Sequence, residues 1–220
     1  MRSYKQSCGL AKALDVVGDR WTLLIVRELL IRGACRYTDI RNGLPGIATN
    51  LLAERLQELE GSGIIVSKLE PPPVATTLFR LTERGRELEP SLLKLGQWGA
   101  PLLADRNDDE DLQAHWLVLP LKLLLVDNAP ERSEAHIELR MPNESITVKV
   151  DRGKVDVGLG PAESPIAVLT GKPELILNLL AGRMTIADAT ANGLALQGPA
   201  AAVRRVVPAA VAAKKARASK

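Results

Sequence analysis

Residues 49–61 carry side chains that could form hydrogen bonds with the edges of DNA bases. Leu52, Leu56 and Leu59 recur at helical spacing, which predicts a helix with one buried stripe. A step of about 100° per residue puts four side chains on the opposite face, with Thr49 close to the helix start: Asn50, Ala53, Glu54 and Gln57. Asn and Gln can each bond an adenine edge twice, and a methyl group can contact thymine. An ordinary solvated polar face is the alternative for this pattern taken alone.

The flanking segments favour the base-reading alternative. A short helix is expected over residues 36–44, followed by a turn at Pro45 and Gly46 and then by the helix at 49–61. Glycines near residue 62 end that helix, and β-branched residues predict two strands at 64–69 and 76–81. The strands are joined by a proline-rich tip at 70–75. This order is typical of a helix-turn-helix with a two-stranded wing.

Basic side chains lie where such a fold would meet DNA phosphates. The net charge is only +3, from 29 Lys and Arg against 26 Asp and Glu, so attraction to DNA must come from a local patch. Lys68 and Arg80 fall on the predicted wing, where phosphate contacts give affinity without sequence information. Solvated surface is the alternative for any one of the candidates, which are Arg20, Arg32, Arg36, Arg41, Lys68 and Arg80.

Two helices are expected before this region, separated at Gly18 and Asp19, and one after it. Thr82 is placed to cap the later helix, whose amphipathic pattern runs from residue 83 to 98 with an acid in its first turn.

Residues 8–99 resemble the HxlR-type winged helix-turn-helix regulators. The resemblance is carried by Cys8, Leu14-Asp-x-x-Gly-Asp-Arg-Trp-Thr22, Arg36-Tyr-x-x-Ile40, Leu44-Pro-Gly-Ile47, Leu56-x-x-Leu59-x-x-x-Gly63, Leu81-Thr-x-x-Gly85 and Gln97-Trp98-Gly99. It implies a homodimer, joined through its outermost helices, on a roughly palindromic site in double-stranded DNA. Ala48 replaces the serine that often begins the recognition helix in such proteins, so we expect Thr49 to be the N-cap.

Cys8 has two interpretations. In some members of the resembled family a cysteine at this position senses oxidants or electrophiles, because a thiolate is favoured near the start of a helix. The alternative is a small buried packing residue, and we favour it because free cysteine often behaves as a small hydrophobe.

The second half of the chain has a different pattern. An apolar helix is expected over 112–126, with a kink or restart at Pro120. Alternating residues predict an antiparallel meander of strands at 135–141, 145–150, 154–159 and 165–169. Helices at 172–180 and 185–190, a strand at 194–197 and a helix beginning at Pro199 follow.

This half resembles a sterol-carrier-protein-like domain. The motifs are a strand ending Asp151-x-Gly153, Thr170-Gly-x-x-Glu174, Leu179-Leu-Ala-Gly-Arg183 and Gly193-Leu-Ala-Leu-Gln-Gly198. The resemblance implies helices over a twisted sheet and an apolar tunnel for a hydrophobic small molecule. A filled core is the alternative for each candidate lining residue: Trp116, Leu175, Ile176, Leu179, Leu180 and Met184.

The expected fold is therefore a mainly α winged helix-turn-helix domain at 1–104, a hinge at 105–111, an α+β sterol-carrier-like domain at 112–208 and a disordered basic tail at 209–220. The longest apolar stretch, residues 116–126, is far below the roughly 20 residues of a membrane span. The amino terminus is polar and lacks an apolar signal core. We expect a cytoplasmic protein.

The sequence gives little support for a catalytic function. The chain has two His and two Cys, with no Gly-x-Ser-x-Gly turn and no phosphate-binding glycine loop, so we expect no enzyme and no cofactor. Cys8, Cys35, His115 and His136 lack the spacing of zinc ligands, so no metal is expected either. The sequence favours a homodimeric, sequence-specific transcriptional regulator whose second domain binds an effector or supports the dimer. The alternative is a hydrophobic-ligand carrier with an accessory DNA-binding domain.

Overall fold

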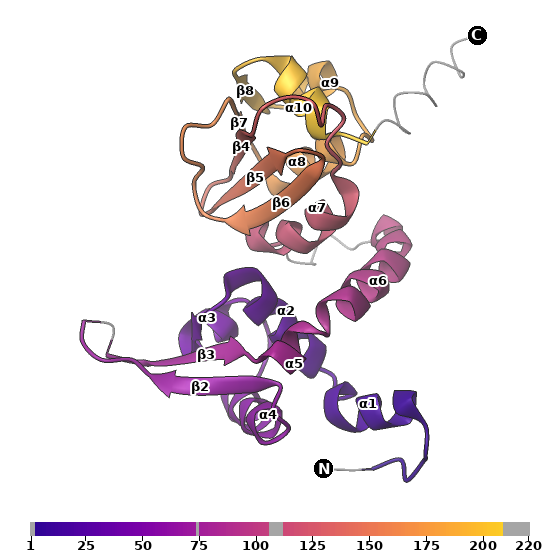
Figure 1. The fold of residues 1–220 in the computed structure, drawn as a ribbon, viewed down its shortest axis with the longest axis vertical. Helices are drawn as coiled ribbons and strands as arrows, with labels where there is room; N and C mark the ends of the chain where they lie inside the picture. The colour runs from indigo at the N-terminus through magenta and orange to yellow at the C-terminus, as the bar shows by residue number, and fades with distance from the viewer. Residues whose placement is uncertain (1–2, 74, 106–111, 209–220) are drawn as a thin grey trace. The chain divides into compact units, whose positions relative to one another are not determined.

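The computed structural model describes residues 3–73, 75–105 and 112–208, which fall into two compact units, Met1–Trp98 and Gly99–Lys220 (Figure 1). Most of the predicted hinge, at 106–111, and the predicted tail at 209–220 lie outside the described residues. Within the described part of the chain, no helix combines the length and the apolar character that crossing a membrane requires.

Four helices of unit 1 follow the predicted order (Figure 1). They are α1 (Gly9–Val17), α2 (Thr22–Arg32), α3 (Tyr37–Asn42) and α4 (Thr49–Gly61). The leucine stripe of α4 is buried as predicted, with Leu52, Leu56 and Leu59 at 3% exposure or less. Around it pack Ile25, Val26, Leu29, Ile40, Leu44, Ile47, Ile65 and Leu81. Burial of this one face is what holds α4 in place, because helix stability in proteins comes mainly from packing.

The expected N-cap of α4 is wrong by one residue. Ala48 has the extended backbone of an N-cap, with φ −71° and ψ 141°, and Thr49 is already helical. The carbonyl of Ala48 accepts the first helical hydrogen bond, from the backbone N–H of Leu52 at 3.0 Å. A cap is defined by the backbone conformation, and here the turn before α4 fixes that conformation without help from a capping side chain.

The wing forms as a three-stranded antiparallel sheet in the order β1-β3-β2. Its strands are β1 (Cys35–Arg36), β2 (Ile65–Leu69) and β3 (Thr77–Leu81), and the hairpin of β2 and β3 extends from the helices (Figure 1). Ile65 and Leu81 are opposite each other at the base of the hairpin, and both are buried. The base of the hairpin is therefore anchored in the same core as α4.

The single helix expected over 83–98 is wrong, because the chain forms two helices. These are α5 (Glu83–Arg86) and α6 (Glu89–Gly99). Thr82 caps α5 as predicted, since its hydroxyl accepts from the backbone N–H of Gly85 at 3.0 Å. Pro90 explains the break: inside a continuous helix its ring would clash with the carbonyl of Arg86, where α5 ends, whereas the first turn of a new helix accommodates proline.

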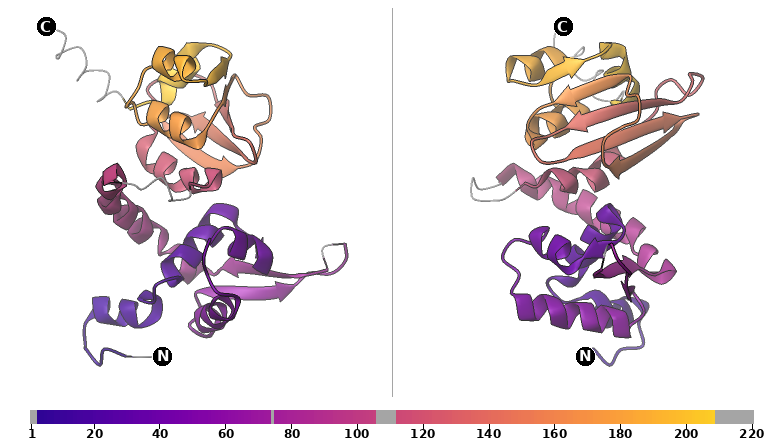
Figure 2. Two further views of the ribbon diagram at one scale, coloured as in Figure 1. Left: turned by 180° about the vertical axis from the view of Figure 1, so that it is seen from behind. Right: turned by 90° about the vertical axis from the view of Figure 1, so that its left-hand side faces the viewer.

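Unit 2 is built on a five-stranded mixed sheet in the order β6-β5-β4-β7-β8. The strands are β4 (Ala135–Arg140), β5 (Ser145–Asp151), β6 (Lys154–Leu159), β7 (Ala167–Thr170) and β8 (Ala195–Gln197). Along β5 the buried residues alternate with half-buried ones, which confirms the predicted two-faced strand. The buried face is covered by helices, which gather on one side of the sheet (Figure 2).

The four-stranded meander is wrong at its last strand. β4, β5 and β6 pair in antiparallel order as expected, but β7 pairs in parallel with β4. Residues 160–166 carry the chain back across the sheet, where His136 Nδ1 lies 3.0 Å from the carbonyl of Glu163 and the Thr147 hydroxyl donates to the carbonyl of Gly160 at 2.9 Å. The edge of β4 that does not pair with β5 is therefore hydrogen-bonded to β7 and is not left exposed.

The helices of unit 2 are η1 (Ala100–Asp105), η2 (Ala114–Leu117), α7 (Val118–Leu124), α8 (Pro173–Leu180), α9 (Ile186–Ala191) and α10 (Ala200–Val206). The apolar segment restarts near Pro120 as predicted, because η2 gives way to α7 and Pro120 falls in the first turn of α7. A first-turn proline costs no hydrogen bond, since backbone N–H groups there have no helical acceptor.

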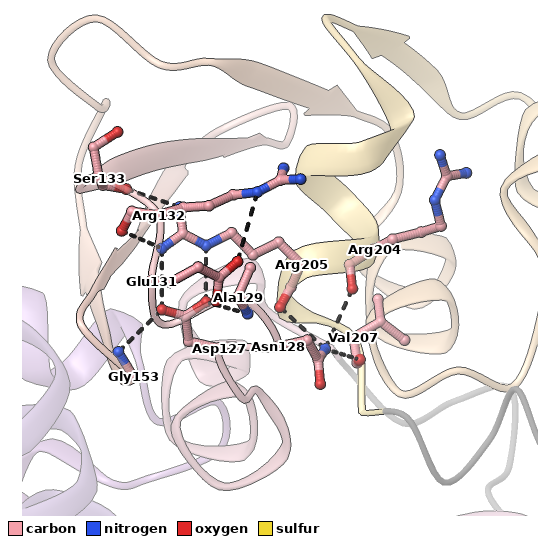
Figure 3. A network of polar contacts seen from close by, with 10 residues as sticks. All are labelled: Asp127, Asn128, Ala129, Glu131, Arg132, Ser133, Gly153, Arg204, Arg205 and Val207. Carbon is pink, nitrogen blue, oxygen red and sulfur yellow. Dashed lines mark hydrogen bonds and ion pairs between the residues drawn. The ribbon is translucent and has the colours of Figure 1, made fainter.

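A buried ion pair connects α10 to the loop before β4 (Figure 3). Arg205 Nε donates to Asp127 Oδ1 at 2.8 Å, and a second guanidinium nitrogen donates to Oδ2 at 3.0 Å. The third nitrogen donates to the carbonyl of Ser133 at 2.9 Å. The side-chain amide of the adjacent Asn128 donates to the carbonyl of Val207 at 2.7 Å. These bonds fix α10 although it is 78 residues from its partner in sequence.

Candidate nucleic-acid interface

The face of α4 opposite its leucine stripe is exposed along its length. The predicted base-reading residues Asn50, Ala53 and Gln57 are all exposed, and so is Thr49 at the first helical position. Glu54 is exposed as well, but its carboxylate accepts from the guanidinium of the neighbouring Arg55 at 3.0 Å. Two amides and a methyl group are therefore presented side by side on a helix whose other face is fixed in the core.

The start of α4 is held by the turn that precedes it. The Tyr37 hydroxyl, at the beginning of α3, donates to the carbonyl of Thr49 at 2.7 Å. Gly46 has φ +84°, a conformation that glycine adopts without a Cβ clash, and it lets the chain reverse between the buried Leu44 and Ile47. The Tyr37 side chain and the backbone turn at Gly46 thus both fix the position of α4 relative to α3.

A buried polar network supports the other end of α3. Glu28 on α2 is fully buried and accepts from Arg27 at 2.7 and 3.0 Å. Arg27 also donates to the carbonyl of Gly43, just after α3, at 3.2 Å. A Cβ on Gly43 would lie 2.0 Å from Glu28 Oε2, so the glycine provides the space for this carboxylate. A buried charge needs such partners, which makes the network a rigid link between α2 and α3.

Arg55 connects α4 to the turn between α1 and α2, a contact that the sequence did not reveal. Its guanidinium is paired with Asp19 and, at 2.6 Å, with Glu58, and its side chain is 12% exposed. The two partners line a polar cavity of about 620 Å³ together with Ser3, Tyr4, Leu14, Asp15, Gly18 and Glu54. Asp19 and Arg55 are 36 positions apart, so helical spacing gives no signal for their pairing.

Three of the predicted phosphate-binding residues lie on one face of the wing. Arg36 and Lys68 are both opposite Leu78, on either side of β3. Arg80 is two residues further along β3, and opposite residues of neighbouring strands point to the same face, as do residues two apart. The structure therefore brings together Arg36, Lys68 and Arg80, all on the face away from the buried Ile65 and Leu81. We call this set the basic face.

The basic face also contains an acidic residue, Glu70, which the sequence patterns did not indicate as a site residue. Glu70 Oε1 lies 2.9 Å from an Arg80 guanidinium nitrogen, and Glu70 Oε2 lies 3.6 Å from Lys68 Nζ. Glu70 follows Lys68 by two residues, and this strand spacing was the signal that could have placed both side chains on the same face.

The other predicted basic residues are separate from the basic face. Arg41 is exposed on α3, and Arg20 is exposed with its guanidinium carbon 5.7 Å from the centre of the Trp21 ring. Arg32 is only half-exposed, because its guanidinium approaches the buried Glu28 one helical turn earlier at 3.5 Å. Arg32 therefore contributes to the internal network and not to an open basic surface.

Comparison with known proteins shows to which family the first part of the chain is similar. The HxlR-like helix-turn-helix family matches residues 16–107. The HTH-type transcriptional regulator YvaP of Bacillus subtilis is 36% identical over 87 residues, which are 40% of this chain and 80% of YvaP. The chain belongs to the HxlR-like helix-turn-helix family.

Other relatives of this family align over a similar region. The HTH-type transcriptional regulator YybR of B. subtilis is 36% identical over 98 residues, covering 43% of this chain and 75% of YybR. A solved structure of the reduced transcriptional regulator YodB from B. subtilis is 28% identical, covers 46% of this chain and all of YodB, and has a TM-score of 0.40.

In this HxlR-like chain Cys8 is exposed, so the packing interpretation that we favoured is wrong. It is the N-cap of α1, and the backbone N–H groups of Ala11 and Leu10 lower the pKa of its thiol below the usual range. Cys35 is buried, and burial raises the pKa of that thiol to about 12. The two thiols therefore differ in accessibility and in readiness to form a thiolate.

Three of the six predicted ligand-lining residues of unit 2 are buried and three are half-buried. Ile176, Leu179 and Leu180 are buried on α8. Trp116 on η2, Leu175 on α8 and Met184 are half-buried, and η2 and α8 contact each other. Among the described residues of this unit, a cavity of about 300 Å³ contains none of these six residues in its lining. It is lined by Arg132, Ser133, Glu134, Ala135, Ile166, Pro199, Ala201, Ala202 and Arg205.

Proposed function

We propose that this protein is a transcriptional regulator that binds double-stranded DNA sequence-specifically, with α4 in the major groove. The observation that carries the proposal is the exposed face of α4. Asn50 and Gln57 extend from a helix whose opposite side is buried, and the Tyr37 bond to Thr49 fixes the helix start. Side chains on a helix that is held this firmly can discriminate between bases, because a bidentate hydrogen bond requires accurate placement of the helix.

The basic face supports the proposal independently. A recognition helix needs phosphate contacts on either side to set its position on the duplex. Arg36, Lys68 and Arg80 are positively charged and lie together on the wing, where contacts with phosphates would not depend on the base sequence. Arg41 on α3 is a further exposed cation in the same unit. We assign these four residues to the phosphate backbone and Thr49, Asn50, Ala53, Glu54 and Gln57 to the base edges.

The regulator is proposed to act as a homodimer. Support comes from α6, on which Leu95 and Trp98 are 52% and 74% exposed, and from α1, on which Leu10 is 69% exposed. Large apolar side chains this open are typical of an interface. Two copies would present two recognition helices to half-sites about 34 Å apart, or a multiple of that distance. Equilibrium sedimentation of the full chain tests this: a stable monomer that still binds one site tightly would contradict it.

DNA selection tests the proposed function directly. The full chain is mixed with random duplex fragments, the retained fragments are sequenced, and binding to the enriched fragment is measured at several salt concentrations. We expect a shared, roughly palindromic motif and a log–log salt slope of about −0.9 for each phosphate contacted. Enrichment of no motif, with equal affinity for every fragment, would leave the hydrophobic-ligand carrier as the better description.

Unit 2 is proposed to be a sterol-carrier-like effector module for a hydrophobic small molecule. The support is the half-buried apolar set of Trp116, Leu175 and Met184, of which the first two belong to contacting elements. Such a ligand changes DNA affinity only if it distinguishes two states of the protein. Mass spectrometry of the purified protein, followed by DNA titration with and without added fatty acid, is the test. No bound lipid and no change in DNA affinity would contradict the proposal.

Cys8 is proposed to be a redox-sensing residue of the regulator. Its exposure and its lowered thiol pKa support this role, because the thiolate is the form that oxidants and electrophiles attack. Diamide treatment of the full chain should change its DNA affinity, and Cys8→Ser should remove the change. An equal response in the serine variant would assign the effect to another residue.

A further inference from the structure

The basic face contains its own counter-charge. In the structure both Lys68 and Arg80 direct their charged ends to one carboxylate, that of Glu70, at 3.6 and 2.9 Å. The side chains of the two cations are 65% and 42% exposed, whereas that of Glu70 is 17% exposed. The carboxylate therefore lies beneath the charged groups that the proposed function assigns to DNA phosphates.

The position of Glu70 is fixed by the backbone of the hairpin. β2 ends at Leu69, and the backbone N–H of Glu70 donates to the carbonyl of Thr76 at 3.0 Å, which extends the pairing by one step toward the tip. Lys68 and Glu70 are two residues apart on an extended strand and share a face. Strand geometry thus places Glu70 on the same face as both cations. Glu70 is beside Lys68 along β2, and the long side chain of Arg80, which is opposite Val66, extends along the strand to the carboxylate.

A phosphate and this carboxylate require the same donors. An arginine or lysine that binds a DNA phosphate releases the cations condensed on the DNA, and this release drives binding. When Glu70 is paired with the same two residues, their combined charge is +1 instead of +2, and a phosphate must displace the carboxylate or bind beside it. Like charges at such short range repel each other.

We propose that Glu70 competes with DNA phosphate for Lys68 and Arg80 and thereby sets the absolute affinity of the wing for DNA. The inference rests on the proposed function, since it concerns the strength of the same interface. Phosphates are identical along the duplex, so the competition acts equally on operator and unrelated sequence. Glu70 would lower both affinities by the same factor and leave their ratio unchanged.

The test compares Glu70→Gln with the unaltered protein on the selected DNA fragment and on an unrelated fragment. Glutamine keeps the size of the side chain and removes the charge. We expect the salt slope to steepen by about 0.9 and binding at about 0.1 M salt to tighten by roughly five- to tenfold on both fragments. Glu87→Gln is the matched control, because Glu87 is an exposed acid of unit 1 outside the wing. It should change binding less than twofold.

A second comparison separates this mechanism from simple removal of negative charge. In a Lys68→Ala/Arg80→Ala background, Glu70→Gln should gain much less affinity, because no paired cations remain to be released. A full gain in that background would overturn the competition. Unchanged or weaker binding by Glu70→Gln alone would overturn it as well and would make Glu70 a positioning residue for the cations. If the unaltered protein bound neither fragment, the proposed function itself would fail.

Discussion

The ion pair between Asp127 and Arg205 gives the sharpest prediction about stability. Replacing Arg205 with Met removes both bonds to the carboxylate and the bond to the carbonyl of Ser133, and leaves the carboxylate of Asp127 without its cation. The side chains of Arg205 and Asp127 are 5% and 0% exposed, so water cannot replace the lost partner. Breaking a buried pair from one side costs about 3–5 kcal/mol, and we expect a loss of this size in the stability of unit 2.

Arg204→Met is the matched control because Arg204 is the adjacent residue of the same helix. Its side chain is exposed and is directed away from the network (Figure 3). Both substitutions replace an arginine of α10 with methionine, so helix propensity changes equally. A surface substitution of this kind is expected to change the free energy of unfolding by less than about 0.5 kcal/mol.

Hydrogen exchange of the full chain is the suitable assay, because a protein of two units need not unfold in one step. Peptides from β5 report the opening of unit 2, and peptides from α4 report unit 1. Arg205→Met should accelerate exchange in β5 by roughly a hundredfold or more and leave α4 unchanged. Equal acceleration by the two methionine variants would refute the buried-pair argument. Adding Asp127→Asn to Arg205→Met should recover part of the loss, since no uncompensated charge then remains.

Three further outcomes are expected. The bonds from Arg205 lower the pKa of Asp127 from 3.8 to about 2. This group therefore contributes about 2 kcal/mol to the stability of unit 2 above pH 3.8, and the contribution is lost as the pH falls toward 2. In acid-unfolding measurements, the stability of Asp127→Asn should depend less steeply on pH over this range than that of the unaltered protein. Asn50→Ala and Gln57→Ala should each lose roughly 1–3 kcal/mol of discrimination at one base pair, whereas Lys68→Ala should weaken binding to all sequences. The measurement is the affinity of each variant for a set of operators that differ at single base pairs. Trp98→Ala should weaken self-association in sedimentation without altering the exchange of α4, and unaltered association would remove α6 from the dimer contact.

The local patterns of the chain determined its elements and the identity of the candidate DNA-binding helix. Leu52, Leu56 and Leu59 defined both faces of α4, because helical periodicity depends only on neighbours within a few residues. The cap at Thr82 and the alternation along β5 were predicted for the same reason. The break before Pro90 was also readable locally, since proline cannot continue a helix, but the amphipathic pattern obscured it.

The tertiary structure decided the contacts between residues far apart in sequence. The parallel pairing of β7 with β4, the bond of Arg55 to Asp19 and the pair of Asp127 with Arg205 have no periodic signal, because each depends on how separate elements pack. Glu70 is an intermediate case. Its place beside Lys68 follows from strand spacing, but its contact with Arg80 required the register of the hairpin, in which a single-residue shift would turn Arg80 to the other face.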